Sequence, residues 1–254
     1  MVRLFLLFLL LIPLHEKPDY PLKNGKPTSR GIDLYIEENA DRLIAEYQDF
    51  VGDSLFDVWI YSENLTEDGY YDSCELGRYY PNEVFITNAE VFLAYELTGL
   101  SSAGRNSLSG TNLFVKSAVF HELTHHYIYQ LGIEMTHRDS IELDRAYQTF
   151  FRIYSAPSGP GSKFIEEGIC EYVCVRMGEI INPKQVYIPQ TPEDLELKEN
   201  QYKVFYKYAT HYVSTFLDTT GLKKGIITLL HNPPPGPGEI LEPELFFARL
   251  KQIE

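Results

Sequence analysis

The sequence predicts an α+β fold that is mainly helical, with a small mixed sheet in its N-terminal part and a long helix that lines a cleft. Two observations support this prediction. Apolar residues recur at helical spacing along most of the chain, and only two short runs are rich in β-branched and aromatic residues. Hydrophobic residues make up 44% of the 254 residues and charged residues 23%, which is typical of a globular domain with a sizeable core.

The N-terminal residues are predicted to be an export segment. A short basic start precedes an unbroken apolar run at residues 4–14, as in a signal peptide. A helix of that length spans about 16 Å, roughly half of the hydrocarbon core of a bilayer. Because no small-residue cleavage site follows, residues 1–14 are predicted to be a signal peptide or an uncleaved anchor, and the protein to be extracytoplasmic, either secreted or periplasmic. A buried helix or strand is the alternative.

The folded part is predicted to follow a linker. Residues 15–31 are rich in Pro, Lys and Gly and lack apolar periodicity, so they are predicted to be a linker before a single domain over residues 32–254. That domain should begin with an amphipathic helix at residues 32–50, which Gly52 ends. Strands are predicted at residues 56–61 and 83–87, and turn-like residues lie between them.

The rest of the chain is predicted to be helical. A long core helix is expected at residues 107–131, with its end at Gly132. Further helices are predicted at residues 139–154, 162–179 and 199–218, and the last of them ends before Gly221. Proline-rich segments at residues 157–161, 182–192 and 233–238 are predicted to be loops.

Charge and cysteine content exclude some classes of protein. The formal net charge of −14 argues against a nucleic-acid partner, because binding phosphates requires a basic face. The three cysteines, Cys74, Cys170 and Cys174, are too few for a disulfide scaffold. Cys170 and Cys174 share a face of a predicted helix, and we expect them to be small buried hydrophobic residues rather than metal ligands.

Residues 121–125 read His-Glu-Leu-Thr-His and match the pattern H-E-x-x-H. Positions i and i+4 of a helix lie on one face, so His121 and His125 can reach one metal ion. A zinc ion there would polarise a carbonyl group and lower the pKa of a water molecule, and Glu122 is placed to take the proton of that water. The pattern therefore predicts a zinc site with Glu122 as general base. Two hydrogen-bonded helical histidines are the alternative interpretation.

Residues 164–172 read FIEEGICEY and resemble the second signature of the gluzincin superfamily, the thermolysin-like and aminopeptidase N-like zinc metallopeptidases. The resemblance implies a zincin-like catalytic domain in which Glu167 is the third zinc ligand and Glu171 supports a ligand histidine. These two glutamates share a helical face, and a supporting carboxylate fixes the orientation of a metal-bound imidazole. Glu166 is the rival ligand, although it points roughly 100° away. A solvated acidic face is the alternative.

Residues 206–217 resemble the helix that follows the zinc site in aminopeptidase N-like gluzincins, which often supplies a tyrosine. The resemblance implies that Tyr206 donates a hydrogen bond to the developing oxyanion. Three other residues compete for this role: Tyr202, Tyr208 and His211. The resemblance also implies that strand 83–87 is the edge on which an extended substrate binds.

These features together predict a zinc metallopeptidase that hydrolyses a peptide or protein substrate, binds no nucleic acid, and contacts a membrane only through a possible N-terminal anchor. His126 and His137 are expected to be ordinary polar residues. One alternative is a catalytically inactive zincin-like module that binds a peptide or protein, but such a module would not need Glu122. Another is a structural metal site closed by Cys170 or Cys174.

Overall fold

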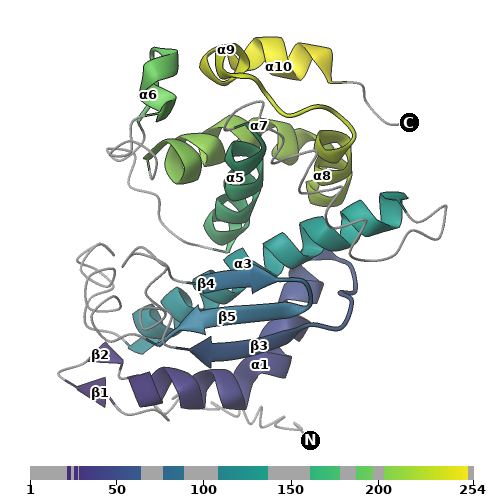
Figure 1. The fold of residues 1–254 in the computed structure, drawn as a ribbon. Coiled ribbons are helices and arrows are strands. Elements are labelled where there is room, and N and C mark those ends of the chain that lie inside the picture. The colour runs from purple at the N-terminus through teal and green to yellow at the C-terminus, as the bar shows by residue number, and fades with distance from the viewer. Residues whose placement is uncertain are drawn as a thin grey trace, which may run out of the picture.

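A long helix, α3 (Leu108–Thr136), lies between a small sheet and a group of later helices (Figure 1). The structure is a computed structural model, and it describes residues 22–23, 26–27, 29–63, 77–88, 108–136, 161–177, 187–196 and 203–250. Over these ranges the chain is mainly helical, and its largest sheet has three strands in mixed orientation. The predicted α+β class agrees with this architecture.

The three-stranded sheet has the order β3-β5-β4. Its strands are β3 (Trp59–Glu63), β4 (Gly77–Tyr80) and β5 (Glu83–Thr87). β5 is parallel to β3 and antiparallel to β4. The prediction that residues 83–87 form a substrate-binding edge is therefore wrong, because β5 is paired on both sides and β4 is the edge nearer to α3. A separate pair consists of β1 (Leu22–Lys23) and β2 (Lys26–Pro27).

Helices α1 (Ser29–Val51) and α3 pack against the sheet. α1 begins three residues before its predicted start, and Gly52 follows it with a φ of 69°. Alternation along the strands buries one face of the sheet and exposes the other. The buried strand residues include Ile60, Val84 and Ile86, and the exposed ones include Trp59, Tyr61 and Tyr80.

β3 begins three residues later than predicted because the side chains of α3 bind the backbone of Phe56. The Phe56 N–H donates to Gln130 Oε1 at 2.7 Å. The Phe56 carbonyl oxygen lies 3.3 Å from His126 Nε2. Both backbone groups are thus used by α3, and neither is available to a strand partner.

α3 also continues past Gly132, where the sequence predicted its end. Leu131 and Ile133 are both buried, so the packing of this last part of the helix outweighs the low helix propensity of glycine. The predicted helix at residues 139–154 lies outside the described residues.

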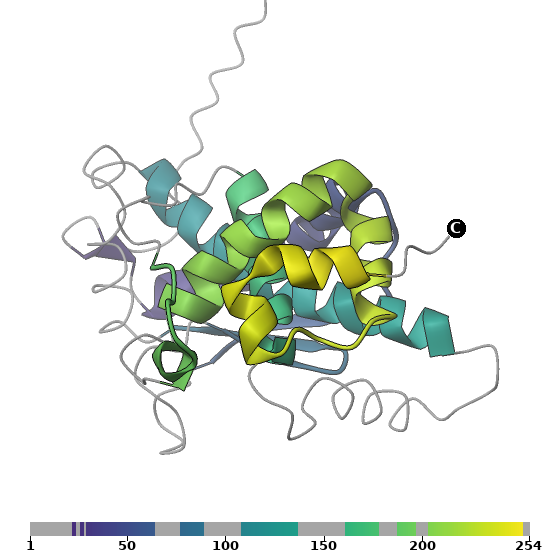
Figure 2. The ribbon, with the colours of Figure 1, turned by 90° about the horizontal axis from the view of Figure 1, so that it is seen from above.

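The later helices form the second half of the molecule. They are α5 (Gly161–Arg176), α6 (Pro192–Glu196), the π-helix η4 (Lys203–Tyr208), α7 (Ala209–Thr220), α8 (Leu222–Leu230), α9 (Pro237–Leu241) and α10 (Pro243–Arg249). Figure 2, which looks down on this half, shows α9 and α10 as its outer layer over α7 and α8. Over its described residues, 203–218, the predicted single helix is thus a π-helical turn followed by an α-helix.

α5 and α7 are in close contact at Gly168. A Cβ atom at this position would lie 2.8 Å from the carbonyl oxygen of Ala209, well inside normal contact distance. A glycine is therefore required directly after Glu167 for α5 to lie against α7.

None of the helices in the described ranges is long and apolar enough to cross a membrane. The predicted export segment at residues 1–14 and most of the predicted linker at residues 15–31 lie outside these ranges.

His126 on α3 connects strand β4 to the segment that precedes β3. Because the Phe56 carbonyl only accepts, Nε2 must donate to it, and Nδ1 then accepts from the Tyr79 hydroxyl at 3.2 Å. This neutral tautomer uses both ring nitrogens. Burial lowers the pKa of His126 from 6.5 to about 4. The prediction that His126 is an ordinary polar residue agrees with these contacts.

We predict that His126→Gln flattens the pH dependence of stability. The native imidazole stays neutral while the unfolded one takes up a proton below its pKa of 6.5, so native stability is lost as the pH falls from there toward about 4. The loss from this group should reach about 2–3 kcal/mol near pH 4.5. Urea unfolding at pH 7 and about pH 4.5 measures it, and an equally steep dependence in the variant would contradict the assignment.

Candidate metal centre

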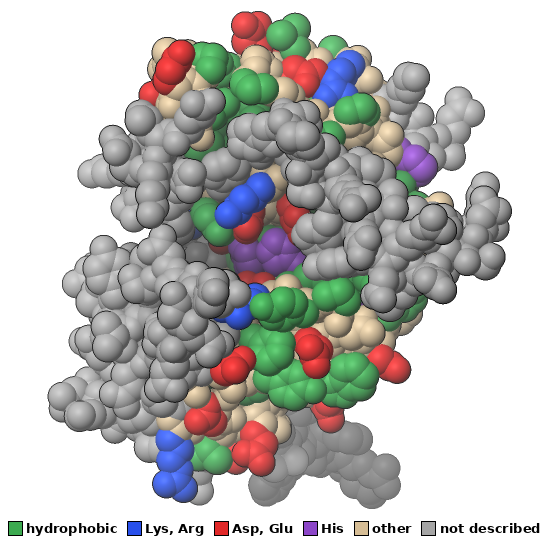
Figure 3. Space-filling view, viewed as in Figure 1, with side chains coloured by type: hydrophobic (Ala, Val, Ile, Leu, Met, Phe, Trp, Pro, Cys, Tyr) green, Lys and Arg blue, Asp and Glu red, His purple; other side chains and the backbone are tan. Residues whose placement is uncertain are grey.

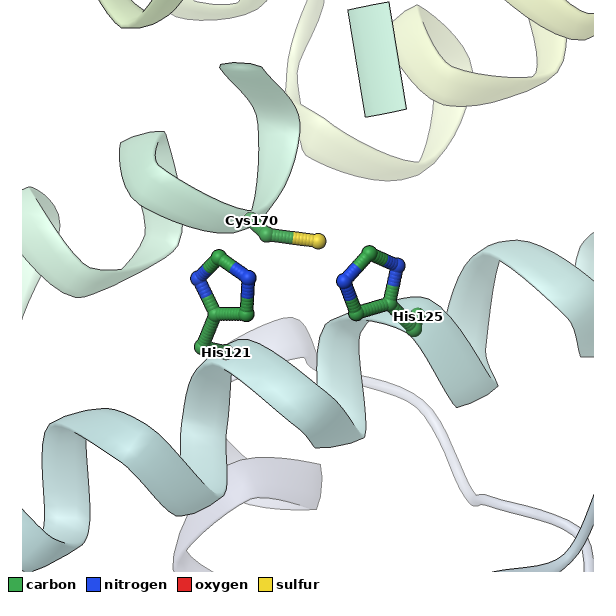
Figure 4. A group of neighbouring side chains, drawn as sticks. All are labelled: His121, His125 and Cys170. Atoms are coloured by element: carbon green, nitrogen blue, oxygen red, sulfur yellow. The ribbon is translucent and has the colours of Figure 1, made fainter. Parts of the chain in front are cut away.

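His121 and His125 lie one turn apart on α3, and their rings are side by side in an edge-to-face arrangement, with centroids 5.1 Å apart and an interplanar angle of 67° (Figure 4). The Nε2 atoms of both rings approach the same oxygen, Glu167 Oε2, at 3.2 Å for His121 and 3.9 Å for His125. α5 carries Glu167 across α3 at this point. The structure therefore brings the three predicted ligands together around one point.

The other nitrogen of each ring faces a second carboxylate. His121 Nδ1 lies 3.4 Å from Glu171 Oε1, where the sequence predicted a supporting carboxylate. His125 Nδ1 lies 2.8 Å from Glu166 Oε1. Glu166, the rival third ligand, thus lies on the side of His125 that faces away from Glu167. Carboxylates in these positions hold an imidazole in one tautomer with Nε2 directed at the metal.

Lys207 is a member of this cluster that the sequence did not predict. Its Nζ donates to Glu171 Oε2 at 3.0 Å, and its side chain is almost fully buried. A lysine in a tyrosine-rich segment would be expected at the surface, because lysine is seldom buried without a partner. Only the packing of η4 against α5 provides that partner. The result is a buried chain of contacts from Lys207 through Glu171 to His121.

The charges in the cluster depend on one another. Burial alone would raise the pKa of Glu167, but the His121 hydrogen bond and the charge of both imidazoles outweigh burial and lower that pKa to about 2. Burial alone would lower the pKa of the imidazoles, but the neighbouring thiols and carboxylates raise the pKa of His121 and His125 well above 6.5. Without a metal ion, the carboxylates therefore favour protonated histidines.

Glu122 lies between α3 and the edge strand β4. Its side chain is buried, and a Cβ atom at Gly77 would lie 2.6 Å from Glu122 Cγ. A side chain at position 77 would therefore displace the Glu122 side chain. The sequence predicts neither β4 nor this contact, because the run Gly-Arg-Tyr-Tyr contains no β-branched residue.

Tyr206 lies over the metal-facing side of α3. Its ring stacks on His121, with centroids 6.1 Å apart and an interplanar angle of 27°, and burial raises its pKa. Two of its three competitors lie elsewhere: the Tyr208 hydroxyl donates to the Ile240 carbonyl at 2.9 Å, and His211 is exposed. Tyr202, the third, lies outside the described residues. Tyr206 belongs to η4, and π-helical turns are frequent at functional sites.

The two cysteines of α5 are buried, as predicted, but their surroundings differ. The Cys174 thiol donates to the Ser117 carbonyl at 3.3 Å. Cys170 instead has its sulfur within 4.8 Å of a nitrogen of both His121 and His125. The prediction that Cys170 is only a small buried hydrophobic residue is therefore incomplete, because its thiol lies where a metal ligand would lie.

The donor atoms fit zinc. Two imidazole nitrogens and one carboxylate oxygen are a donor set of catalytic zinc sites, and a thiol is also a zinc ligand. Histidine side chains are visible at the centre of the face in Figure 3, between described atoms of the sheet and of the helices, with acidic side chains beside them. The side chains of His121 and His125 are each 13% exposed.

The chain matches no family model, no curated protein and no solved structure.

We predict that Glu167→Ala and Glu166→Ala weaken zinc binding by different amounts. Glu167→Ala removes the oxygen that both Nε2 atoms approach, so affinity should fall by more than about 100-fold. Glu166→Ala frees only Nδ1 of His125, so the loss should be about 10- to 100-fold. Competition with a chromophoric chelator measures both. The control variant is Glu193→Ala, because Glu193 is exposed. A larger loss of zinc affinity in Glu166→Ala than in Glu167→Ala would identify Glu166 as the third ligand instead.

Proposed function

We propose that this protein is a zinc-dependent metallopeptidase of the zincin type, related to the gluzincins, that hydrolyses peptide bonds. The observation that carries the proposal is the convergence of His121 Nε2 and His125 Nε2 on Glu167 Oε2, with a buried Glu122 adjacent to the first histidine. His121, His125 and Glu167 would hold the metal. When bound, zinc would polarise the scissile carbonyl and lower the pKa of a water molecule.

Glu122 is the proposed general base. It follows His121 directly in the chain, and its buried side chain lies against Gly77 of β4. It would take a proton from the attacking water and give that proton to the leaving amine, which balances the hydrolysis without a further acid. The contact with Gly77 limits the space on one side of the Glu122 side chain.

Tyr206 is the proposed donor to the oxygen that gains negative charge. Its raised pKa keeps the hydroxyl protonated at neutral pH, and its ring lies against His121. A donor held in place before the reaction stabilises the developing charge without reorganisation.

β4 supports a peptide as the substrate. It is an edge of the described sheet, and Gly77 at its start contacts Glu122. An extended peptide that pairs with this edge would place its backbone beside the proposed general base. Backbone atoms would make the hydrogen bonds of this pairing. We therefore propose peptides as the substrate class, without a preference for particular side chains.

One observation favours a second candidate, a closed structural metal site. Cys170 offers a fourth donor beside the two histidines, and sites with four protein ligands are structural rather than catalytic. The buried Glu122 favours catalysis, because a structural site gains nothing from an additional buried carboxylate next to its ligands.

We predict that Glu122→Gln abolishes peptide cleavage and leaves zinc bound. Glutamine has the shape of glutamate but cannot take up the proton of water, so the rate should fall by about 10²- to 10⁴-fold. The measurements are cleavage of a peptide library by mass spectrometry and zinc content by elemental analysis, each with and without chelator.

The matched control is Glu134→Gln, which removes an exposed glutamate from the same helix. Unchanged cleavage in Glu122→Gln would refute the proposed mechanism. A zinc-loaded wild type that cleaves no member of the library would favour a binding or structural role.

A further inference from the structure

Cys170 lies one turn after Glu167 on α5, and its side chain points toward the two histidines. In Figure 4 its sulfur lies beside the gap between the two imidazole rings. The sulfur and one nitrogen of each ring are all within 4.8 Å of one another. The side chain is fully buried, so the thiol belongs to the interior of the site rather than to its solvent side.

The distances are close to those of a shared metal ion. Donor atoms bound tetrahedrally to zinc at about 2.0–2.3 Å lie roughly 3.3–3.8 Å from one another. The separations here are at most 4.8 Å, which exceeds these values by up to about 1.5 Å, and side-chain rotations can make up this difference. Glu167 Oε2 lies within the same range of both histidines. Two imidazole nitrogens and the Cys170 sulfur therefore lie close enough to share one ion, and Glu167 Oε2 approaches the same two imidazoles.

Cys174 provides an internal comparison on the same helix. It is as deeply buried as Cys170, but its thiol donates to a backbone carbonyl of α3. That contact is typical of a cysteine that acts as a small core residue. Cys174 also raises the pKa of His121, but the Cys170 sulfur lies near a nitrogen of both His121 and His125, which is the environment of a metal-binding thiol.

We propose that Cys170 is a fourth protein ligand, so that the metal site has a closed state with the Cys170 sulfur bound and an open state in which the sulfur has withdrawn. The proton of the thiol is released when the sulfur–metal bond forms. In the closed state no position is left for water, and hydrolysis stops. The inference rests on the proposed function, because it concerns the regulation of the same site.

Cobalt(II) is a suitable probe, because a cobalt–sulfur bond gives an intense near-ultraviolet charge-transfer band, whereas the visible d–d bands report cobalt binding by any donor set. The full-length wild-type protein loaded with Co²⁺ should show both. Cys170→Ser should lose the charge-transfer band completely and keep the d–d bands. In Cys170→Ala, peptide cleavage by the zinc form should rise several-fold, because the open state is then permanent.

Two matched controls identify the sulfur. Cys174→Ser removes the other buried thiol of α5, and Cys74→Ser removes the remaining cysteine of the chain. Both should retain the charge-transfer band. Zinc K-edge X-ray absorption of the wild type tests the same bond without any substitution, and it should show one sulfur in the coordination shell.

The outcomes separate this inference from the proposed function. Cobalt bound with d–d bands but no charge-transfer band in the wild type would overturn the Cys170 inference and leave the peptidase proposal intact. A band that disappears in Cys174→Ser or Cys74→Ser, and persists in Cys170→Ser, would also overturn it. Failure of the wild type to bind cobalt or zinc would overturn both. If Cys170→Ser loses the charge-transfer band but Cys170→Ala cleaves peptides no faster than the wild type, the closed state would be refuted.

Discussion

The crossing of α3 and α5 is the contact on which the site depends. Contacts between the two helices pair Ser117 with Cys174, His121 with Glu171, and His125 with Glu166. Residue numbers therefore rise along α3 while they fall along α5. A helix offers one side chain per turn to such a crossing. Two histidines one turn apart therefore meet carboxylates and a thiol one turn apart, and Gly168 lets α7 support α5 from behind.

The same crossing concentrates charge in a place where charge is costly. Three carboxylates lie against the two histidines, those of Glu166, Glu167 and Glu171, and the buried Glu122 is next to His121 in the chain. Lys207 donates to Glu171, and the charge of Lys163 lowers the pKa of Glu167. Isolated buried charges are unfavourable, so such clusters are paired or coordinate metals. The raised pKa of the histidines is one form of compensation, and a divalent cation would be another.

The sequence predicts the parts of this site that depend on spacing along one helix. His121, Glu122 and His125 follow from a single pattern, and Glu167 and Glu171 follow from a second pattern together with a family resemblance. Contacts between distant segments were not predictable in the same way. Lys207 near Glu171, Gly77 near Glu122 and the metal-facing thiol of Cys170 each depend on how two elements pack. For the fold, periodicity located α1, α3 and α5, but it missed β4 and the π-helical turn, because neither has a strong local signal.

We propose that the face of α3 that carries the two histidines is one metal site rather than a set of hydrogen-bonded polar residues. Anomalous diffraction from crystals of the zinc-loaded protein, recorded on both sides of the zinc edge, tests this most directly. The account predicts one strong anomalous peak about 2.0–2.1 Å from Nε2 of both His121 and His125. A zinc-loaded crystal with no peak there, or with its zinc bound elsewhere, would contradict it.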